Sequence, residues 1–215
     1  MKLRSVVVAC AVVVAAAVLG IGHESQFVFT PEAMHRIANQ AISENKGSED
    51  PQGIVDSVRS LLKKEYPDYI IDDSEWLFNN AGGAMGAMVV LHASLSEYVI
   101  IFGSPIGTEG HSGRFLSDDY FTILHGEQWA YSPGQLTKEV YEPGSQHLMP
   151  KGVAKGYKIP DCGCWALEYA RGNILSMMPF GMADLLSSTL DPITFWQTVK
   201  VSGGNMFKML LKGKV

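Results

Sequence analysis

Residues 88–102 read MVVLHASLSEYVIIF, which is two apolar runs separated by a short polar stretch. The runs Met88–His92 and Tyr98–Phe102 are rich in β-branched and aromatic residues, as expected for strands. Similar short runs, divided by Gly, Pro, Ser or Asp, follow at Tyr120–Leu124, Glu139–Tyr141 and Trp165–Tyr169. This spacing predicts an antiparallel barrel or jelly roll over residues 76–170, and a small barrel of this kind can enclose one ligand.

Two amphipathic helices are predicted before the strands. Thr30-Pro31 offers an N-cap hydroxyl followed by proline at the first helical position, and apolar residues then recur on one face as far as Ile42. A second apolar stripe runs over residues 54–62 and ends at Tyr66-Pro67. We expect both helices to cover the sheet.

The chain becomes helical again after Gly172. A mostly apolar helix is predicted over residues 174–190, and a further helix begins at Asp191-Pro192. The second helix combines aromatic residues such as Trp196 with several lysines, a pattern typical of helices at a membrane interface. A helix that closes the mouth of a barrel has the same pattern, and we expect these helices to do both.

The N-terminal residues 5–22 read SVVVACAVVVAAAVLGIG and contain no charge. At a rise of 1.5 Å per residue such a helix spans roughly 27 Å, close to the apolar thickness of a bilayer. Lys2 and Arg4 precede it, which favours a cytosolic N-terminus. A cleaved signal peptide remains the alternative. The expected organisation is an anchor over residues 1–25, a helix-covered barrel over 26–172 and membrane-associated helices over 173–215.

The composition excludes several classes of function. The net charge is −5 and no long basic run occurs, so a nucleic-acid partner is not expected. The three cysteines, Cys10, Cys162 and Cys164, lack the spacing of a zinc site or a disulfide framework. The six histidines form no metal-ligand pair at helical or strand spacing, and no cofactor motif is present. We therefore expect neither a metal nor a cofactor.

Two acidic features could carry chemistry. Glu168 is a lone carboxylate in an apolar strand, and Asp118-Asp119 precedes another strand, in which Asp119 and Phe121 share a face. A solvent-facing glutamate and an aspartate pair in a turn are the simpler interpretations. If Glu168 and Asp119 instead met inside the barrel, they would share a proton and supply a neutral acid at pH 7.

Several specific strings occur in colinear order over roughly residues 26–200. They are NAGGAMGAM (80–88), LHASLSEY (91–98), GHSGR (110–114), TKEVYEPG (137–144), EYARG (168–172) and ADLLSST (183–189). On these strings the chain resembles the family of fungal-type sterol C8 isomerases and the sigma non-opioid receptor. The resemblance implies a cupin-like β-barrel without a metal, one N-terminal transmembrane helix and two C-terminal helices against the membrane. It also implies a homotrimer and a single-pass location in the endoplasmic reticulum membrane.

The resemblance also implies a site. Glu168 matches the pocket acid of the family, and Tyr98 matches a tyrosine beside it. The receptor branch has its second acid where this chain has Phe121, and the isomerases share Asp118-Asp119, so we infer that Asp119 pairs with Glu168 while Asp118 remains open. Positions expected in the apolar wall of the substrate site are Met88, Val90, Ile100, Phe102, Phe121, Ile174 and Phe180.

The function expected from this resemblance is a shift of a sterol double bond from Δ8 to Δ7. A protonated carboxyl would deliver a proton to C9, a cation would form at C8, and a proton would leave C7. Cationic amines would inhibit by mimicking that cation. The alternatives are a receptor-like membrane chaperone that binds ligands without turnover, and a secreted lipid carrier with a cleaved leader.

Overall fold

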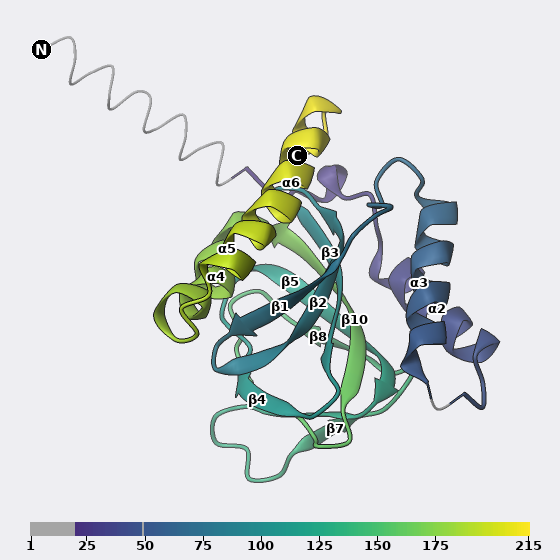
Figure 1. Ribbon diagram of the computed structural model, residues 1–215, viewed down its shortest axis with the longest axis vertical. Coiled ribbons are helices and arrows are strands. Elements are labelled where there is room, and N and C mark those ends of the chain that lie inside the picture. The colour runs from purple at the N-terminus through teal and green to yellow at the C-terminus, as the bar shows by residue number, and fades with distance from the viewer. Residues whose placement is uncertain (1–19, 49) are drawn as a thin grey trace, which may run out of the picture.

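The computed structural model describes residues 20–48 and 50–215, which form two antiparallel sheets with helices on the outside (Figure 1). One sheet has the strand order β1-β2-β3-β10-β5-β8 and the other the order β4-β9-β6-β7. The strands are β1 (Trp76–Ala81), β2 (Ala84–Ala93), β3 (Glu97–Ser104), β4 (Thr108–His111), β5 (Leu116–Gly126), β6 (Gln128–Tyr131), β7 (Glu139–Tyr141), β8 (Gln146–Met149), β9 (Gly156–Ile159) and β10 (Cys164–Asn173). The prediction of a mainly β fold with flanking helices is confirmed.

The hairpin between β1 and β2 has a tight turn made of two glycines. Gly82 and Gly83 form the two-residue turn, with φ of +62° and +86°. Two successive positive φ angles match the twist of a hairpin and are unfavourable for residues with a Cβ atom. A Cβ atom on Gly82 would also collide with the carbonyl oxygen of His111, which belongs to β4 of the other sheet. This turn therefore brings the two sheets into close contact.

Helices α2 (Pro31–Glu44) and α3 (Pro51–Glu65) cover the outer face of the larger sheet (Figure 1). The side chains of Thr30 and Asp50 cap their N-termini by accepting hydrogen bonds from the backbone N–H groups of Ala33 and Gln52. Apolar residues at helical spacing then face the sheet. The buried members are Met34, Ile37, Ala38 and Ala41 from α2 and Ile54, Val55, Val58 and Leu62 from α3.

Strand β10 separates two apolar clusters. Its residues Leu167 and Tyr169 point outward and pack with α2 and α3. Ala166 and Ala170 point the other way, into the space between the two sheets, where they pack with residues of β3 and β9. Because successive side chains of a strand alternate in direction, Glu168 shares the inward face.

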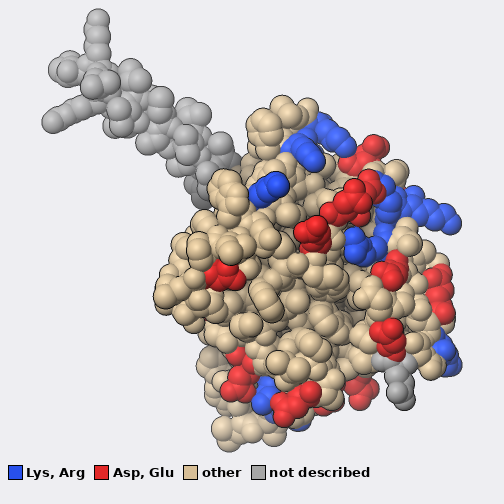
Figure 2. Space-filling model, in the orientation of Figure 1, with Lys and Arg blue, Asp and Glu red and all other residues tan. Residues whose placement is uncertain are grey.

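The C-terminal helices lie against β1 and β2 at one end of the sheets (Figure 1). The expected helix over residues 174–190 is shorter: a 3₁₀ turn, η2 (Ile174–Ser176), precedes α4 (Met178–Ser187). Asp191 then caps α5 (Pro192–Thr198), which continues through a π-helical segment (Val199–Gly203) into α6 (Gly204–Leu211). Large apolar side chains remain exposed here: Leu190, Ile193, Trp196, Phe207 and Leu211. In Figure 2 charged residues gather over α2 and α3, whereas few lie over α4 and α5.

The expected transmembrane helix and the single-pass location in the endoplasmic reticulum membrane require correction. Within residues 20–48 and 50–215, no helix is both long enough and apolar enough to cross a membrane. The longest, α3, has 15 residues and is amphipathic, whereas a span needs about 20 apolar residues. The N-terminal run on which the expectation rested lies outside the described residues, except for the turn at 20–22.

Candidate active site

A cavity lies between the two sheets and is closed at one end by α4 and α5. Seven predicted side chains line it, namely Met88, Tyr98, Ile100, Phe102, Phe121, Ile174 and Phe180, together with Asp119 and Glu168. Val90 is fully buried in the same interior cluster but does not reach the cavity. The structure therefore gathers residues from strands and helices far apart in the sequence around one space.

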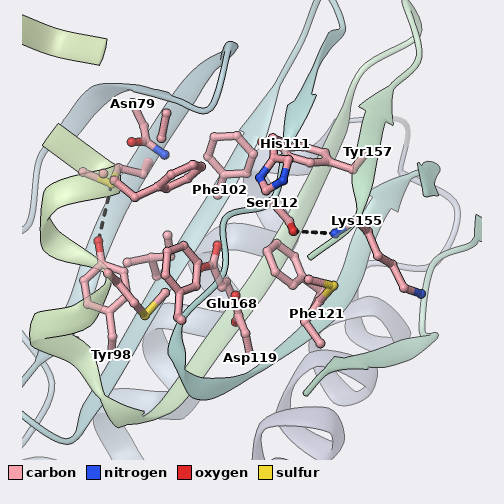
Figure 3. Close-up of a pocket in the computed structure, with 18 of the residues that line it drawn as sticks. Asn79, Tyr98, Phe102, His111, Ser112, Asp119, Phe121, Lys155, Tyr157 and Glu168 are labelled. Carbon is pink, nitrogen blue, oxygen red and sulfur yellow. Dashed lines mark hydrogen bonds between the residues drawn. The ribbon is translucent and has the colours of Figure 1, made fainter. Parts of the chain in front are cut away.

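Glu168 and Asp119 are brought together by the pairing of β10 with β5. Glu168 lies directly opposite Phe121, and Asp119 is two residues from Phe121 on the same face, opposite Ala170. Both carboxyl groups point into the cavity, and Figure 3 shows them side by side between Tyr98 and Phe121. Their side chains are nearly inaccessible, since Glu168 is 9% exposed and Asp119 is 7% exposed.

The environment of these carboxyl groups favours their protonated form. Burial raises the pKa of Glu168 to about 7, opposed in part by a hydrogen bond from Asp119. Burial raises the pKa of Asp119 well above its usual range, and the charge of Glu168 and the donated hydrogen bond raise it further. Among the ion pairs of the described residues none involves either group. The two groups therefore titrate as a pair that retains a proton near neutral pH.

Asp118 lies on the opposite face of β5 from Asp119. It is paired in register with Arg171, and its Oδ1 accepts a hydrogen bond from the backbone N–H of Lys151 at 2.8 Å. It does not line the cavity. The geometry therefore places Asp119, and not its neighbour, next to Glu168.

Tyr98 flanks the carboxyl pair from β3. It lies opposite Ala170, so that Ala170 separates it from Asp119 in one row across three strands. Its hydroxyl contacts Met88 Sδ at 3.5 Å (dashed in Figure 3). Burial, followed by the charges of Glu168 and Asp119, raises the pKa of the Tyr98 phenol. The phenol is therefore neutral at pH 7, so it can donate one hydrogen bond and its oxygen can accept another.

The sequence did not single out several residues that line the far wall. Gln128 on β6, His147 on β8 and Tyr157 on β9 all reach the cavity. Their strands have only four residues each, too few for an alternation to indicate which side chains point inward. Burial raises the pKa of Tyr157, so its phenol is neutral.

The open space of the cavity is about 120 Å³. A cavity of about 150 Å³ accommodates a molecule of the size of benzene. A larger apolar ligand must therefore displace side chains, and methionines are the most adaptable of these. Met149, Met177, Met178 and Met182 line the cavity together with Met88.

Metal binding has no support from the described side chains. Within residues 20–48 and 50–215 no three His, Cys, Asp or Glu residues are grouped closely enough to hold a metal ion. Acid–base chemistry by the carboxyl pair is the reaction that this arrangement can perform.

Comparison with solved structures returns matches of low similarity. A cupin superfamily protein from Desulfitobacterium hafniense matches with a TM-score of 0.35 and 16% identity, covering 39% of this chain and 74% of that chain. A likeness this weak carries no argument about function.

Comparison of the sequence is far more specific. A C-8 sterol isomerase of Pyricularia oryzae is 52% identical over 193 residues, covering 89% of this chain and 86% of the relative. A sigma non-opioid intracellular receptor 1 of Danio rerio is 37% identical over 178 residues, covering 82% of this chain and 78% of the relative. The family model described as "ERG2 and Sigma1 receptor like protein" matches residues 5–214. The chain therefore belongs to the family of ERG2 and Sigma1 receptor like proteins.

Proposed function

We propose that the protein is a C-8 sterol isomerase that moves the Δ8 double bond of a sterol to Δ7. The observation that carries this proposal is a buried pair of carboxyl groups, Glu168 and Asp119, that shares a proton inside an apolar cavity. The higher identity to an isomerase than to a sigma receptor, 52% against 37%, supports an enzyme over a receptor.

The proposed reaction needs only this pair. The protonated carboxyl delivers its proton to C9, and the electrons of the double bond form the new C–H bond, which leaves a cation at C8. The ionised carboxylate stabilises that cation and removes a proton from C7, and the electrons of the broken C–H bond form the Δ7 double bond. The pair ends with the same number of protons, so no other reactant is consumed.

The surroundings of the pair suit a carbocation. Ile100 and Phe121 lie opposite Glu168 on the two neighbouring strands, and both are apolar. An apolar wall excludes water that would otherwise add to the cation. It also strengthens the attraction between the cation and the carboxylate, because the local dielectric constant is low.

Turnover by the purified protein tests this function. Wild-type protein supplied with a Δ8 sterol in detergent is expected to give the Δ7 isomer, and Glu168→Gln is expected to lower kcat by about 10²- to 10⁴-fold. Binding of the sterol without isomer formation by the wild type would favour a receptor without turnover.

Cationic amines are proposed as inhibitors of the same site. An ammonium group next to Glu168 and Asp119 would favour their ionised form, so binding should release the shared proton. Calorimetry in two buffers of different ionisation enthalpy measures that release at pH 7. An amine that binds without releasing a proton would contradict contact with the pair.

Two further partners remain predictions. The exposed apolar residues of α4–α6, among them Trp196, suit contact with a lipid surface from which a sterol could be taken up. Flotation with phosphatidylcholine vesicles, comparing wild type with Trp196→Ser, tests this contact. The expected homotrimer is tested by light scattering in detergent.

A further inference from the structure

The wall of the cavity opposite the C-terminal helices contains two buried polar atoms that lack partners. Gln128 is 4% exposed, and its Oε1 accepts no hydrogen bond from any described residue. His147 Nδ1 is likewise buried and unpartnered within the described part of the chain. Both residues line the cavity that holds Glu168. A buried polar atom without a partner costs about 1–3 kcal/mol, so these two positions are suited to a ligand.

Both residues are neighbours of Tyr141, which lies between them. Gln128 is directly opposite Tyr141 in the pairing of β6 with β7, and His147 stacks on the Tyr141 ring with 3.9 Å between ring centroids. His147 also stacks on Phe121 at 5.4 Å. These contacts fix the imidazole and place the amide and the imidazole at the same end of the cavity.

The chemistry of this end matches a hydroxyl group. Burial and the nearby Lys155 lower the pKa of His147 to about 4, although Glu139 opposes this, so the ring is neutral. A neutral imidazole can donate from Nδ1, and the amide oxygen of Gln128 can only accept. A hydroxyl group both donates and accepts one hydrogen bond, so it would satisfy both atoms.

An anionic group fits this end less well. The only cation that lines the cavity within the described residues, Lys155, is already paired with Glu139, which also accepts a hydrogen bond from Tyr141. A sulfate or phosphate ester placed here would therefore approach the carboxylate of Glu139. The subsite favours a free alcohol over a charged ester.

The register of the sheet sets the distance from this end to the carboxyl pair. Glu168, Phe121 and His147 form one row across β10, β5 and β8. Neighbouring strands are about 4.8 Å apart, so the backbones of Glu168 and His147 are separated by about 10 Å. Phe121 lies between them in this row, so a rigid ring system that extends past the Phe121 ring can contact both.

We propose that Gln128 and His147 bind the ring-A hydroxyl group of the sterol and thereby fix which end of the substrate enters the far wall. This inference rests on the proposed function, because the substrate class follows from it. The hydroxyl group on ring A and the reacting carbons of rings B and C belong to one rigid nucleus, so anchoring the former positions the latter. The aliphatic tail then lies under α4 and α5, where Met178, Phe180 and Met182 line the cavity.

The test compares a Δ8 sterol with its 3-deoxy analogue in wild type, Gln128→Leu and His147→Phe. In His147→Phe the phenyl ring preserves the stacking with Tyr141 and Phe121, so this variant removes only the hydrogen-bonding atoms. Gln128→Leu probes the same subsite independently. Wild type is expected to favour the hydroxylated sterol by about ten- to hundredfold in kcat/KM. Each variant should lose most of that preference through a higher KM for the hydroxylated sterol, with little change for the deoxy analogue.

Thr198→Val is the matched comparison, because Thr198 Oγ1 is also buried, unpartnered among the described residues and directed to the cavity, but on α5. It should affect both sterols equally. If Thr198→Val removes the preference, the substrate binds in the reverse orientation and the inference is wrong. Equal losses for both sterols in Gln128→Leu and His147→Phe would also overturn it.

A binding measurement separates this inference from the proposed function. Ring-nitrogen analogues of the sterol, with and without the 3-hydroxyl group, are titrated by calorimetry. If wild type converts no sterol, the function fails, yet a preference for the hydroxylated analogue that disappears in Gln128→Leu would still support the subsite. Turnover without any preference for the hydroxyl group, in rate or in binding, would reject the subsite alone.

Discussion

Asp119 lies diagonally across the β5–β10 pair from Glu168, one inward-facing position away from the residue directly opposite. Diagonal neighbours on a sheet are about 7–8 Å apart at the backbone, so two carboxyl groups reach each other only when the side chains lean together. The residue opposite Asp119 is Ala170, whose methyl group leaves room for this. The arrangement permits proton sharing while one side of the pair stays open to the cavity.

Asp119→Asn and Asp118→Asn form a matched pair of substitutions on adjacent residues. Only Asp119 faces Glu168, so Asp119→Asn should lower kcat by about 10²- to 10⁴-fold. Asp118→Asn should retain activity within about threefold, because its amide oxygen can still accept the hydrogen bond from the Lys151 N–H group. Steady-state assays of Δ8 sterol conversion measure both, and a larger effect at Asp118 would contradict the assignment.

Activity should fall on the alkaline side of neutrality. The pair needs one proton to start the reaction. Asp119 donates the hydrogen bond to Glu168 and carries that proton, which is lost as the pH rises through the pKa of Asp119, raised well above its usual range by burial and by the charge of Glu168. Above that value kcat/KM should decrease about tenfold per pH unit. Sterols do not titrate in this range, so the enzyme alone accounts for the change. A profile that shows no alkaline fall up to the pH at which the protein unfolds would show that no proton of the pair is required.

The same pair should make stability depend on pH. Folding raises the pKa values of Glu168 and Asp119 above their ordinary values of 4.5 and 3.8, so the folded state binds more protons than the unfolded state. The resulting stabilisation is complete below about pH 4 and is lost as the pH rises through the raised pKa values of the two groups, about 7 for Glu168.

Chemical denaturation of wild type and the double variant Glu168→Gln/Asp119→Asn at pH 5 and pH 8.5 measures this effect. The difference in unfolding free energy between the two proteins should favour the wild type more at pH 5. His92 and His147, whose pKa values burial lowers to about 4, titrate in the opposite sense but are common to both proteins. A difference that does not vary with pH would mean that the pair is not perturbed by folding.

Glu97 and Lys214 should contribute strongly to stability away from the site. Glu97 is fully buried, accepts hydrogen bonds from the Val28 N–H, the Phe29 N–H and the Tyr169 hydroxyl, and lies 2.8 Å from Lys214 Nζ. Glu97→Gln leaves the buried ammonium group without its counter-charge, which should lower the free energy of unfolding by about 3–5 kcal/mol.

Glu65→Gln is the control for Glu97→Gln. Glu65 pairs with Arg36 at a similar distance, 2.7 Å, but both side chains are exposed. Loss of such a surface pair should cost far less stability than loss of the buried pair. Urea denaturation of both variants gives the comparison, and equal effects would show that the burial of the Glu97–Lys214 pair is unimportant.

The sequence predicted the fold best where local patterns determine structure. Alternation along residues 164–170 correctly separated Glu168 from Leu167 and Tyr169, and the Thr30-Pro31 signal located the start of α2. The resemblance supplied the inward direction of Glu168, which alternation alone could not decide.

The remaining features depend on contacts between distant segments. His147 reaches the cavity because β8 pairs with β5, and nothing in its four residues indicates that pairing. Lys214 is buried because the end of the chain returns to residues 26 and 97, although a terminal lysine is normally expected in solvent. The predicted helix over residues 174–190 was too long, because its first three residues form a 3₁₀ turn and α4 ends at Ser187.

The two faces of β10 serve separate parts of the molecule, since Leu167 and Tyr169 pack under the helices while Glu168 lines the cavity. Substitutions on the helix-facing side can adjust heat tolerance without altering what the enzyme accepts, and substitutions on the other side can do the reverse. Lineages living at different temperatures, or with different lipids, can therefore adapt one property while the other is inherited unchanged.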